Sequence, residues 1–533
     1  MNVVSAGGGL LLAMLLLPMV GSAVVAPMRS TPTVAKVTGM VFALGELVLA
    51  ALAWSAYQPT GGRLQLILSI PWIPAFGTRF ALGIDGIALV MIALVSVLVP
   101  IVMGSSWAEK LPEDRTPAGF YALLLALQSL LIGVFVSTDV FLFYLFFEVM
   151  LVPMYFLIGR FGGPRRQYAA VKFFLYSLLG GLVMLGSVIG LFVVSGNRLG
   201  HGTFDWASLV RIAGSVPQST QIWLFLGFFV ALAIKAPLVP FHTWLPDAGA
   251  EAPIGVGVLL VGVMDKVGIY GFLRYCLPLF PAASRALAPL VLVLAVVGVL
   301  YGALLAVGQS DMKRFVSYTS VAHFGFIALG VFAFSTQAQA GAVLYMVNHG
   351  ISTGMLFIVV GMLIARGGSR LISDYGGVAA LAPLLAGMML VAGLSSLALP
   401  GTNSFVSEFM VLVGSFPRQP VYTILATTGM ILAALYVLWF YQRLMQGPVR
   451  GAAVVGPLPG PGTATAPEAA AQRQRARFPD LSIREIAVLT PLVALILLLG
   501  LYPQPVLNVI NPSVGATLTE VGLSDPVVGQ GGR

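Results

Sequence analysis

The chain has 533 residues, of which 58% are hydrophobic and only 9% are charged. A soluble domain carries about 25% charged residues, so this composition excludes an ordinary soluble protein. Apolar runs recur along the whole length, each of the roughly 20 residues needed to cross about 30 Å of hydrocarbon. A barrel would show short alternating segments instead, so we predict an all-α, polytopic membrane protein.

The pattern of apolar runs predicts about 14 transmembrane helices. We expect them at residues 3–26, 34–56, 84–104, 118–137, 139–159, 169–195, 221–245, 252–275, 286–307, 315–334, 340–365, 380–414, 421–444 and 484–503. The stretch 380–414 is too long for one straight helix and contains Pro400-Gly401, which indicates a broken span. No Lys or Arg precedes Arg29, so the first span is expected to be retained rather than cleaved as a signal peptide.

The net charge of +9 comes from basic residues in the loops, which indicates membrane topology rather than nucleic-acid binding. Loops after odd-numbered spans hold 17 Lys and Arg, and loops after even-numbered spans hold 7. Since basic loops stay in the cytoplasm, we predict a multi-pass protein of the bacterial plasma membrane with both termini outside. The segment Gly447–Asp480, rich in Gly, Pro and Ala, is expected to be a flexible cytoplasmic loop.

Lys235 interrupts an otherwise apolar run that continues past it to Trp244. An ammonium group at that depth costs about 2.5–3.5 kcal/mol unless it faces polar groups or water. Pro237 and Pro240 then break the helix and leave two preceding carbonyls in need of other partners. A buried cation at a helix break is typical of an ion or proton path; the alternative is a lysine that extends to the membrane interface.

A second break, at Pro400-Gly401, lies five spans after the first. Interrupted segments at matching positions indicate two inverted five-helix repeats, with broken helices in spans 7 and 12. Lys235 ends a half-helix, where the dipole favours a cation, and Glu408 lies early in one, where the dipole favours an anion. Thr402 to Ser404 are expected to cap that half-helix.

These features predict five parts of the chain. They are N-terminal helices 1–3 (residues 1–117), a first repeat (118–275), a second repeat (286–444), the flexible loop (445–483), and the last helix with a C-terminal tail (484–533).

Ten ionisable residues lie inside the predicted spans: Glu46, Glu148, Lys172, Lys235, His242, Asp265, Lys266, His323, His349 and Glu408. Burial favours the neutral form of each, whereas an ion pair favours the charged forms. A Glu–Lys contact at ~4 Å contributes roughly 4 kcal/mol at an effective dielectric of ~20, so breaking it makes a lysine release its proton. We therefore predict a proton relay, whose members are Glu148, Lys235, Lys266, His323, His349 and Glu408.

Two alternatives remain open at this point. The lysines and glutamates also fit static ion pairs that pin helices together, and each histidine also fits a packed polar residue. Glu46 has no obvious local partner, Lys172 is expected to face the cytoplasm, and Asp265 points about 100° away from Lys266 on a helix and need not pair with it.

Sequence motifs for cofactors are missing from the chain. Its one cysteine, Cys276, excludes internal disulfides and Cys-ligated iron–sulfur or zinc sites. Gly255-Val-Gly257 lacks the third glycine of a dinucleotide loop, and there is no GxxxxGK[ST] motif for an ATP-driven pump. No span carries two histidines for a haem, so we expect no cofactor and no metal in this chain.

Four segments carry a resemblance to a known family. They are Lys235–Pro253, Val261–Arg274, Asp311–Gly325 and Leu399–Phe409. They resemble the signature of the antiporter-like, proton-translocating membrane subunits of respiratory complex I, the NADH–quinone oxidoreductase, over about residues 80–445. In the subfamily that the chain most resembles, the relay ends in a glutamate, as at Glu408, where sister chains place lysine.

The resemblance implies a role for each relay residue. Glu148 resembles the span-five glutamate that pairs with Lys235, Lys266 the central lysine, His323 and His349 the histidines that carry protons onward, and Glu408 the terminal residue facing the next subunit or the periplasm. Two departures, Gly249 in place of a common histidine and Ile254-Gly255 in place of a small polar pair, leave the proton entry route unassigned.

The resemblance also implies that flavin, iron–sulfur clusters and quinone belong to partner subunits, with neighbouring antiporter-like subunits beside this chain in the bilayer. One rival is the related Mrp-type cation/proton antiporter subunit, which forms a different assembly. Another is a passive scaffold of the membrane arm, which would tolerate charge-neutral substitutions in the relay. Co-purification with soluble flavin and iron–sulfur subunits separates complex I from Mrp.

The predicted orientation has a direct test. A cysteine placed within Gly447–Asp480 should react with an impermeant thiol reagent only in inside-out vesicles, because the positive-inside rule puts this loop in the cytoplasm. Labelling from the periplasmic side of intact cells would contradict the orientation.

Overall fold

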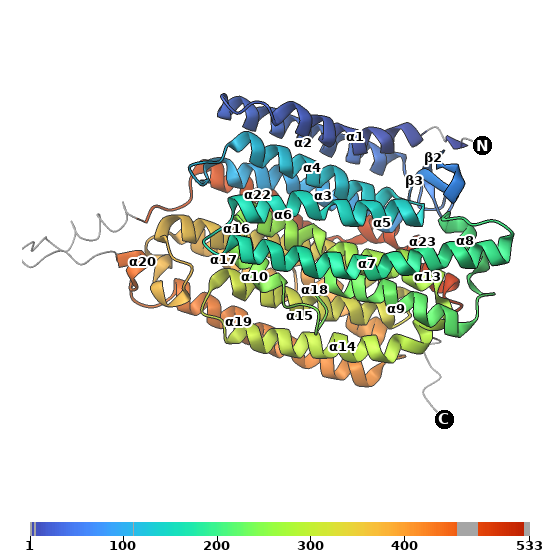
Figure 1. Cartoon of the computed structure of the whole chain (residues 1–533). Coiled ribbons are helices and arrows are strands. Elements are labelled where there is room, and N and C mark those ends of the chain that lie inside the picture. The colour runs from blue at the N-terminus through green and yellow to red at the C-terminus, as the bar shows by residue number, and fades with distance from the viewer. Residues whose placement is uncertain (1–2, 5–6, 110, 456–477, 527–533) are drawn as a thin grey trace, which may run out of the picture.

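The computed structural model describes residues 3–4, 7–109, 111–455 and 478–526. Within these residues, 13 helical segments are long and apolar enough to cross a membrane, and they lie side by side in one bundle (Figure 1). They are Gly8–Val25 (α1), Pro32–Ala56 (α2), Gly86–Ala108 (α3 and η2), Pro117–Val136 (α4), Val140–Phe161 (α5 and α6), Arg166–Leu199 (α7), Gln218–Lys235 (α9), Ile254–Leu279 (α11 to α13), Pro281–Val307 (α14), Met312–Phe332 (α15), Thr336–Gly367 (α16), Pro420–Met445 (α19) and Ile483–Leu501 (α22).

The one predicted span outside this set of 13 is the twelfth, residues 380–414. It consists of two shorter helices, Pro383–Ser396 (α17) and Asn403–Ser415 (α18), which confirms the break at Pro400-Gly401 within a mostly helical fold. Span seven is broken as well. Helix α9 ends at Lys235, well before the predicted end at residue 245, and the short helix α10 (Leu245–Glu251) follows a non-helical turn. The inverted relation of the two halves stays a prediction.

Several elements were not predicted. A three-stranded antiparallel sheet, in the order β1 (Val3–Val4), β2 (Gln65–Ile73) and β3 (Thr78–Ile84), covers one end of the bundle near α8 (Trp206–Ala213) (Figure 1). The expected C-terminal tail instead contains helix α23 (Gln504–Glu520), since its apolar residues recur at helical spacing and face α3 and α16. Helix α20 (Ala452–Val455) lies at the other end, and residues 456–477 of the predicted flexible loop are outside the described residues.

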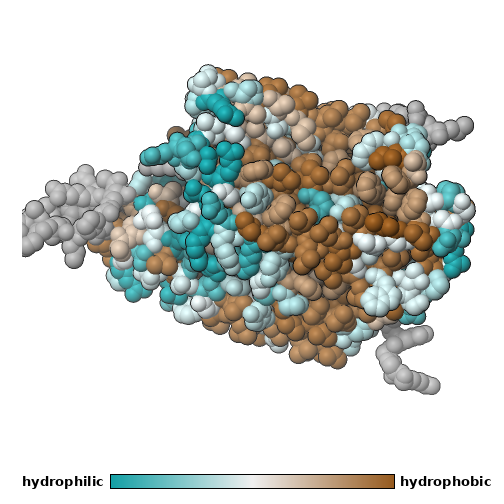
Figure 2. Space-filling view, viewed as in Figure 1, coloured by the Kyte–Doolittle hydropathy of each residue, from teal (hydrophilic) through white to brown (hydrophobic). Residues whose placement is uncertain are grey.

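Burial divides the bundle into a core and a periphery. The most apolar window of the helix Ile254–Leu279 is 100% buried and those of α15 and α16 are 94% buried, whereas those of α2, α19 and α22 are 28% buried. The visible face carries a broad apolar region between more hydrophilic ends (Figure 2). The most buried helices therefore hold half of the predicted relay residues, namely Lys266, His323 and His349.

An ion cluster closes the strand end of the bundle. Asp85 caps the N-terminus of α3, and its Oδ2 accepts hydrogen bonds from Arg63 Nη1 (3.0 Å) and Arg274 Nη1 (3.3 Å). The buried Arg274 guanidinium lies 3.9 Å from the centroid of the Trp206 ring. Arg63 also forms an ion pair with Glu520 at the end of α23. The N-terminal strand β1 pairs with β2 at the same end of the bundle, so both ends of the described chain lie there.

Loss of the Asp85 carboxylate should destabilise the protein strongly. Asp85→Ala leaves the buried Arg274 without its counter-ion, a change that costs about 3–5 kcal/mol. We expect a clearly lower Tm of the purified protein and less of it in membranes. Asp114→Ala, which removes the more exposed Arg115 ion pair, is the matched control and should cost at most about 1 kcal/mol. Equal Tm values for the two variants would contradict this account.

Candidate functional site

Lys235 lies at the end of α9, where the helix breaks. Its ammonium nitrogen is buried and stands 5.0 Å from the centroid of the Phe147 ring and 5.6 Å from that of Phe173. A desolvated ammonium gains electrostatic stabilisation from such rings. Because Trp244 beyond it is also buried, Lys235 does not extend to the membrane interface.

The backbone freed by the break finds new partners. Pro237 cannot donate to the carbonyl of Ala233, and the N–H of Leu238 donates to it instead (2.9 Å). Trp244 Nε1 donates to the carbonyl of Ile234 (2.8 Å). These bonds fix Lys235 at a helix end inside the protein, where the dipole favours its charge.

Glu148, near the end of α5 (Val140–Val149), is not bonded to Lys235 in this structure. Within the part of the chain that the structure describes, neither carboxylate oxygen of Glu148 nor the Lys235 ammonium has a hydrogen-bond partner, and the two do not form an ion pair within 4.0 Å. The ion pair implied by the resemblance is therefore not formed in this structure, although Phe147, next to Glu148 in sequence, contacts the Lys235 ammonium.

Lys266 is held by three groups at the centre of the bundle. Its Nζ donates to the carbonyl of Val261 and to Asp265 Oδ1 (3.1 Å), and lies 2.6 Å from His349 Nδ1. Asp265 and Lys266 thus pair, although a regular helix would point them apart. A π-helical segment, η3 (Leu260–Met264), directly precedes them and changes the local side-chain directions.

From His349 a chain of polar groups continues to Glu408. The ring centroids of His349 and His323 are 5.2 Å apart, and His323 Nδ1 lies 3.2 Å from the Tyr345 hydroxyl. That hydroxyl donates to Glu408 Oε2 at 2.8 Å. His349, His323, Tyr345 and Glu408 are all buried. These contacts bring together four of the predicted relay residues: Lys266, His349, His323 and Glu408.

The sequence analysis missed the two tyrosines that contact His323. Tyr345 bridges His323 to Glu408, and the Tyr436 hydroxyl lies 3.4 Å from His323 Nε2. A signal for Tyr345 was present, because it precedes His349 by four residues on α16 and so lies on the same helix face. Nothing in the sequence placed Tyr436 beside His323, because α19 meets α15 only in the folded bundle.

The break in span twelve is satisfied by side chains of α16. Asn348 Nδ2 donates to the carbonyl of Asn403 (2.7 Å), and Asn403 Oδ1 accepts from Ser395 Oγ (2.6 Å) and Ser352 Oγ (3.1 Å). Thr402 occupies the predicted cap position of α18, but its hydroxyl donates backwards to Leu399 and does not cap the helix. The network fixes α18, and with it Glu408, against α16.

Three other ionisable residues predicted inside spans lie apart from the polar side chains between Lys266 and Glu408. Glu46 is fully buried, and among the described residues its oxygens have no hydrogen-bond partner. Lys172 donates to Asp247 Oδ2 (2.7 Å), and the ring of His242 packs edge-on against Tyr301. Within the same part of the chain, no group of three or more His, Cys, Asp or Glu is placed to hold a metal.

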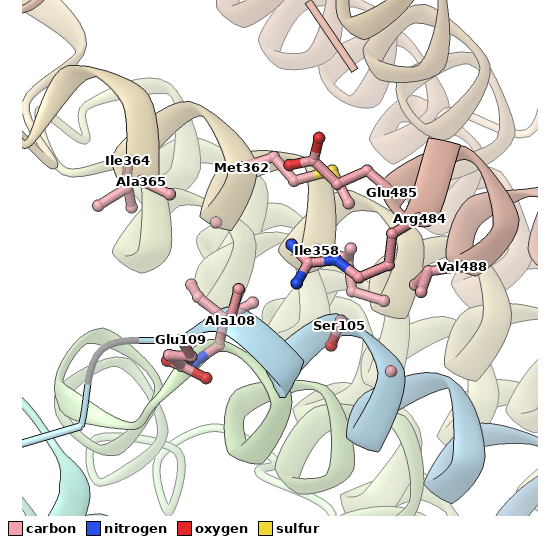
Figure 3. A pocket seen from close by; sticks show the side chains of 13 residues that line it. Ser105, Ala108, Glu109, Ile358, Met362, Ile364, Ala365, Arg484, Glu485 and Val488 are labelled. Atoms are coloured by element: carbon pink, nitrogen blue, oxygen red, sulfur yellow. Dashed lines mark hydrogen bonds between the residues drawn. The ribbon is translucent and has the colours of Figure 1, made fainter. Parts of the chain in front are cut away.

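A cavity lies at the opposite end of the bundle from the sheet, between α3, α16 and α22. Figure 3 shows Glu109 and Arg484 at its wall, with the Arg484 side chain reaching across from α22. Glu109 Oε1 accepts from the N–H of Ile254 (3.2 Å), the first residue of α11. Burial raises the pKa of Glu109 above that of an exposed glutamate.

Comparison with known proteins identifies the family. Residues 137–433, more than half of the chain, match the family model described as NADH:quinone oxidoreductase/Mrp antiporter, TM. NADH-quinone oxidoreductase subunit M of Mycobacterium tuberculosis (strain H37Rv) is 44% identical over 523 residues, covering 92% of this chain and 90% of the relative. The protein of the same name from Escherichia coli (strain K12) is 38% identical, covering 90% of each.

Solved structures agree with the sequence relatives. A chain of respiratory complex I from Thermus thermophilus with bound NADH is 28% identical, with a TM-score of 0.82, covering 96% of this chain and 100% of that one. A chain of the Mrp complex from Dietzia sp. DQ12-45-1b has a TM-score of 0.78 at 21% identity, covering 95% of this chain and 52% of that one, which shows a shared fold alone.

The broken spans and the buried polar chain thus define an antiporter-like membrane protein. Within that class, the chain belongs to the NADH-quinone oxidoreductase subunit M family.

Proposed function

We propose that this chain is a proton-translocating membrane subunit of NADH-quinone oxidoreductase and acts as a proton translocase driven by redox chemistry in other subunits. The observation that carries the proposal is a buried series of polar side chains from Lys266 to Glu408. Lys266 contacts His349, the rings of His349 and His323 pack with centroids 5.2 Å apart and no hydrogen bond between them, and Tyr345 bridges His323 to Glu408. Static ion pairs account less well for this series, because most of its members are neutral hydrogen-bonding groups that both accept and donate protons.

The first step of the proposed relay is the separation of an ion pair between Glu148 and Lys235. Contact at ~4 Å would contribute roughly 4 kcal/mol, which exceeds the roughly 2.3 kcal/mol needed to move one charge through 100 mV. When Glu148 moves away, the Lys235 ammonium loses this stabilisation and passes its proton towards Lys266. Gly268 supports the transfer, since its lack of a side chain lets α12 (Lys266–Gly271) pack against the backbone of Ala236 at the end of α9.

The later steps follow the polar contacts. Lys266 Nζ gives a proton to His349 Nδ1, which lies 2.6 Å away, and the proton moves on to the neighbouring ring of His323. Tyr345 then accepts a proton from His323 and gives its own hydroxyl proton to Glu408. Glu408 is the proposed terminal residue, which delivers protons to a neighbouring subunit or to the periplasm.

The relatives favour complex I over an Mrp-type antiporter as the assembly. Relatives named subunit M are up to 44% identical over nearly the whole chain, whereas the likeness to the Mrp complex supports only a common fold. We further propose that this chain holds no redox centre and that its neighbours in the membrane are other antiporter-like subunits. We also propose that the five parts predicted from the sequence are the divisions of the chain and that both termini face the periplasm.

Glu148→Gln tests the first step. The amide keeps the shape of the side chain but carries no negative charge, so it cannot control the Lys235 proton. NADH-driven acidification of inside-out vesicles should fall roughly tenfold or more while the complex stays assembled. The same substitution at the exposed Glu113 is the matched control and should leave pumping unchanged. Normal pumping by an assembled Glu148→Gln complex would refute the role of this residue.

Tyr345→Phe tests the last step. The phenyl ring keeps the packing but removes the O–H that links His323 to Glu408, so pumping should again fall by roughly tenfold. Tyr121→Phe, which removes a buried hydroxyl bonded to the carbonyl of Met103, is the control outside the relay. If both tyrosine variants acidify vesicles at the parent rate, the proton does not pass through the Tyr345 hydroxyl.

A further inference from the structure

The carboxylate of Glu148 occupies the space that a side chain at position 181 would fill. A Cβ built on Gly181 would overlap Oε1 and Cδ of Glu148 and lie 3.0 Å from its Oε2. Both residues are on neighbouring helices, α5 and α7, and Gly181 is buried. Only a glycine at this position leaves room for the carboxylate where it lies in this structure.

The preceding residue has a separate packing role. A Cβ on Gly180 would lie 3.0 Å from Ala231 Cα and 2.8 Å from Ile234 Cδ1, so Gly180 lets α9 approach α7 closely. The pair of glycines therefore faces two neighbours at once, α9 with Lys235 and the carboxylate of Glu148. Gly186, further along α7, has no atom within 4 Å of its built Cβ, so close contact is not general on this helix.

Lys235 contacts aromatic rings in this arrangement and has no ion pair with Glu148 within 4.0 Å. Phe147 of α5 and Phe173 of α7 lie on its ammonium group, at 5.0 Å and 5.6 Å from the ring centroids. Each partner of the ion pair thus has its own place when the pair is open: the lysine between two aromatic rings, and the carboxylate against Gly181.

We propose that Gly181 forms a socket that holds the Glu148 carboxylate away from Lys235, and that Glu148 moves between this socket and the lysine. Gly181 is therefore a positioning residue of the first relay step. The inference rests on the proposed function, since the position of the carboxylate matters to pumping only if Glu148 controls the Lys235 proton.

Gly181→Ala tests the socket. The added methyl fills the space of the carboxylate and drives Glu148 towards Lys235, which holds the ion pair closed and the proton on the lysine. The assembled complex should keep NADH oxidation with an artificial acceptor but lose proton pumping by roughly tenfold. A structure of the variant should show Glu148 and Lys235 within 4 Å. Gly186→Ala, on the same helix with open space around it, is the control and should pump at the parent rate.

A double variant separates the socket from general packing damage. Glu148→Asp shortens the side chain by one methylene, so Gly181→Ala with Glu148→Asp should pump several times faster than Gly181→Ala alone. If Gly181→Ala does not assemble, recovery of assembly in the double variant supports competition for the same space. No recovery of pumping or assembly in the double variant would overturn the socket.

The two proposals fail in different ways. Parent-rate pumping by Gly181→Ala together with defective Glu148→Gln removes the socket and leaves the proposed function standing. Parent-rate pumping by an assembled Glu148→Gln complex removes the proposed function itself.

Discussion

Burial of the Lys266 ammonium group in the middle of the bundle is the constraint on which the rest of the interior depends. An isolated ammonium in hydrocarbon is costly, so the fold must bring polar groups to it. The structure supplies a backbone carbonyl from Val261, a carboxylate from Asp265 and a ring nitrogen from His349. The π-helical segment before Lys266 and the position of α16 are both parts of this solution.

Lys235 and Lys266 are both buried ammonium groups, but different kinds of side chain surround them. Lys266 has a carboxylate and an imidazole within hydrogen-bonding distance, whereas Lys235 has two aromatic rings and, among the described residues, no hydrogen-bond partner. In the proposed relay, an arrangement without the Glu148–Lys235 ion pair is the stage that precedes transfer from Lys235 towards Lys266.

Helix α16 joins the residues of the proposed relay to the broken helix that carries Glu408. Tyr345 and His349 lie on one part of α16 and face His323, Glu408 and Lys266. Asn348 donates to the backbone carbonyl of the buried Asn403, and Ser352 donates to its side chain. Non-helical backbone at membrane depth is tolerated only when it is satisfied inside the protein. The same helix thus makes the break stable and sets the distance from Tyr345 to Glu408.

The sequence by itself determined the membrane class, the number of spans, both helix breaks and several of the buried ionisable residues, among them Lys235 and Lys266, but not the buried Asp85 and Arg274. These follow from local properties: the length of apolar runs, the missing N–H of proline, and the cost of charge in hydrocarbon. Only the tertiary structure decided the partners. Asp265 pairs with Lys266 directly after a π-helical segment, Tyr345 and Tyr436 approach His323 from other helices, and the carboxylate of Glu148 lies against Gly181. Such contacts depend on how distant helices pack and rotate against one another, which apolar periodicity leaves undetermined.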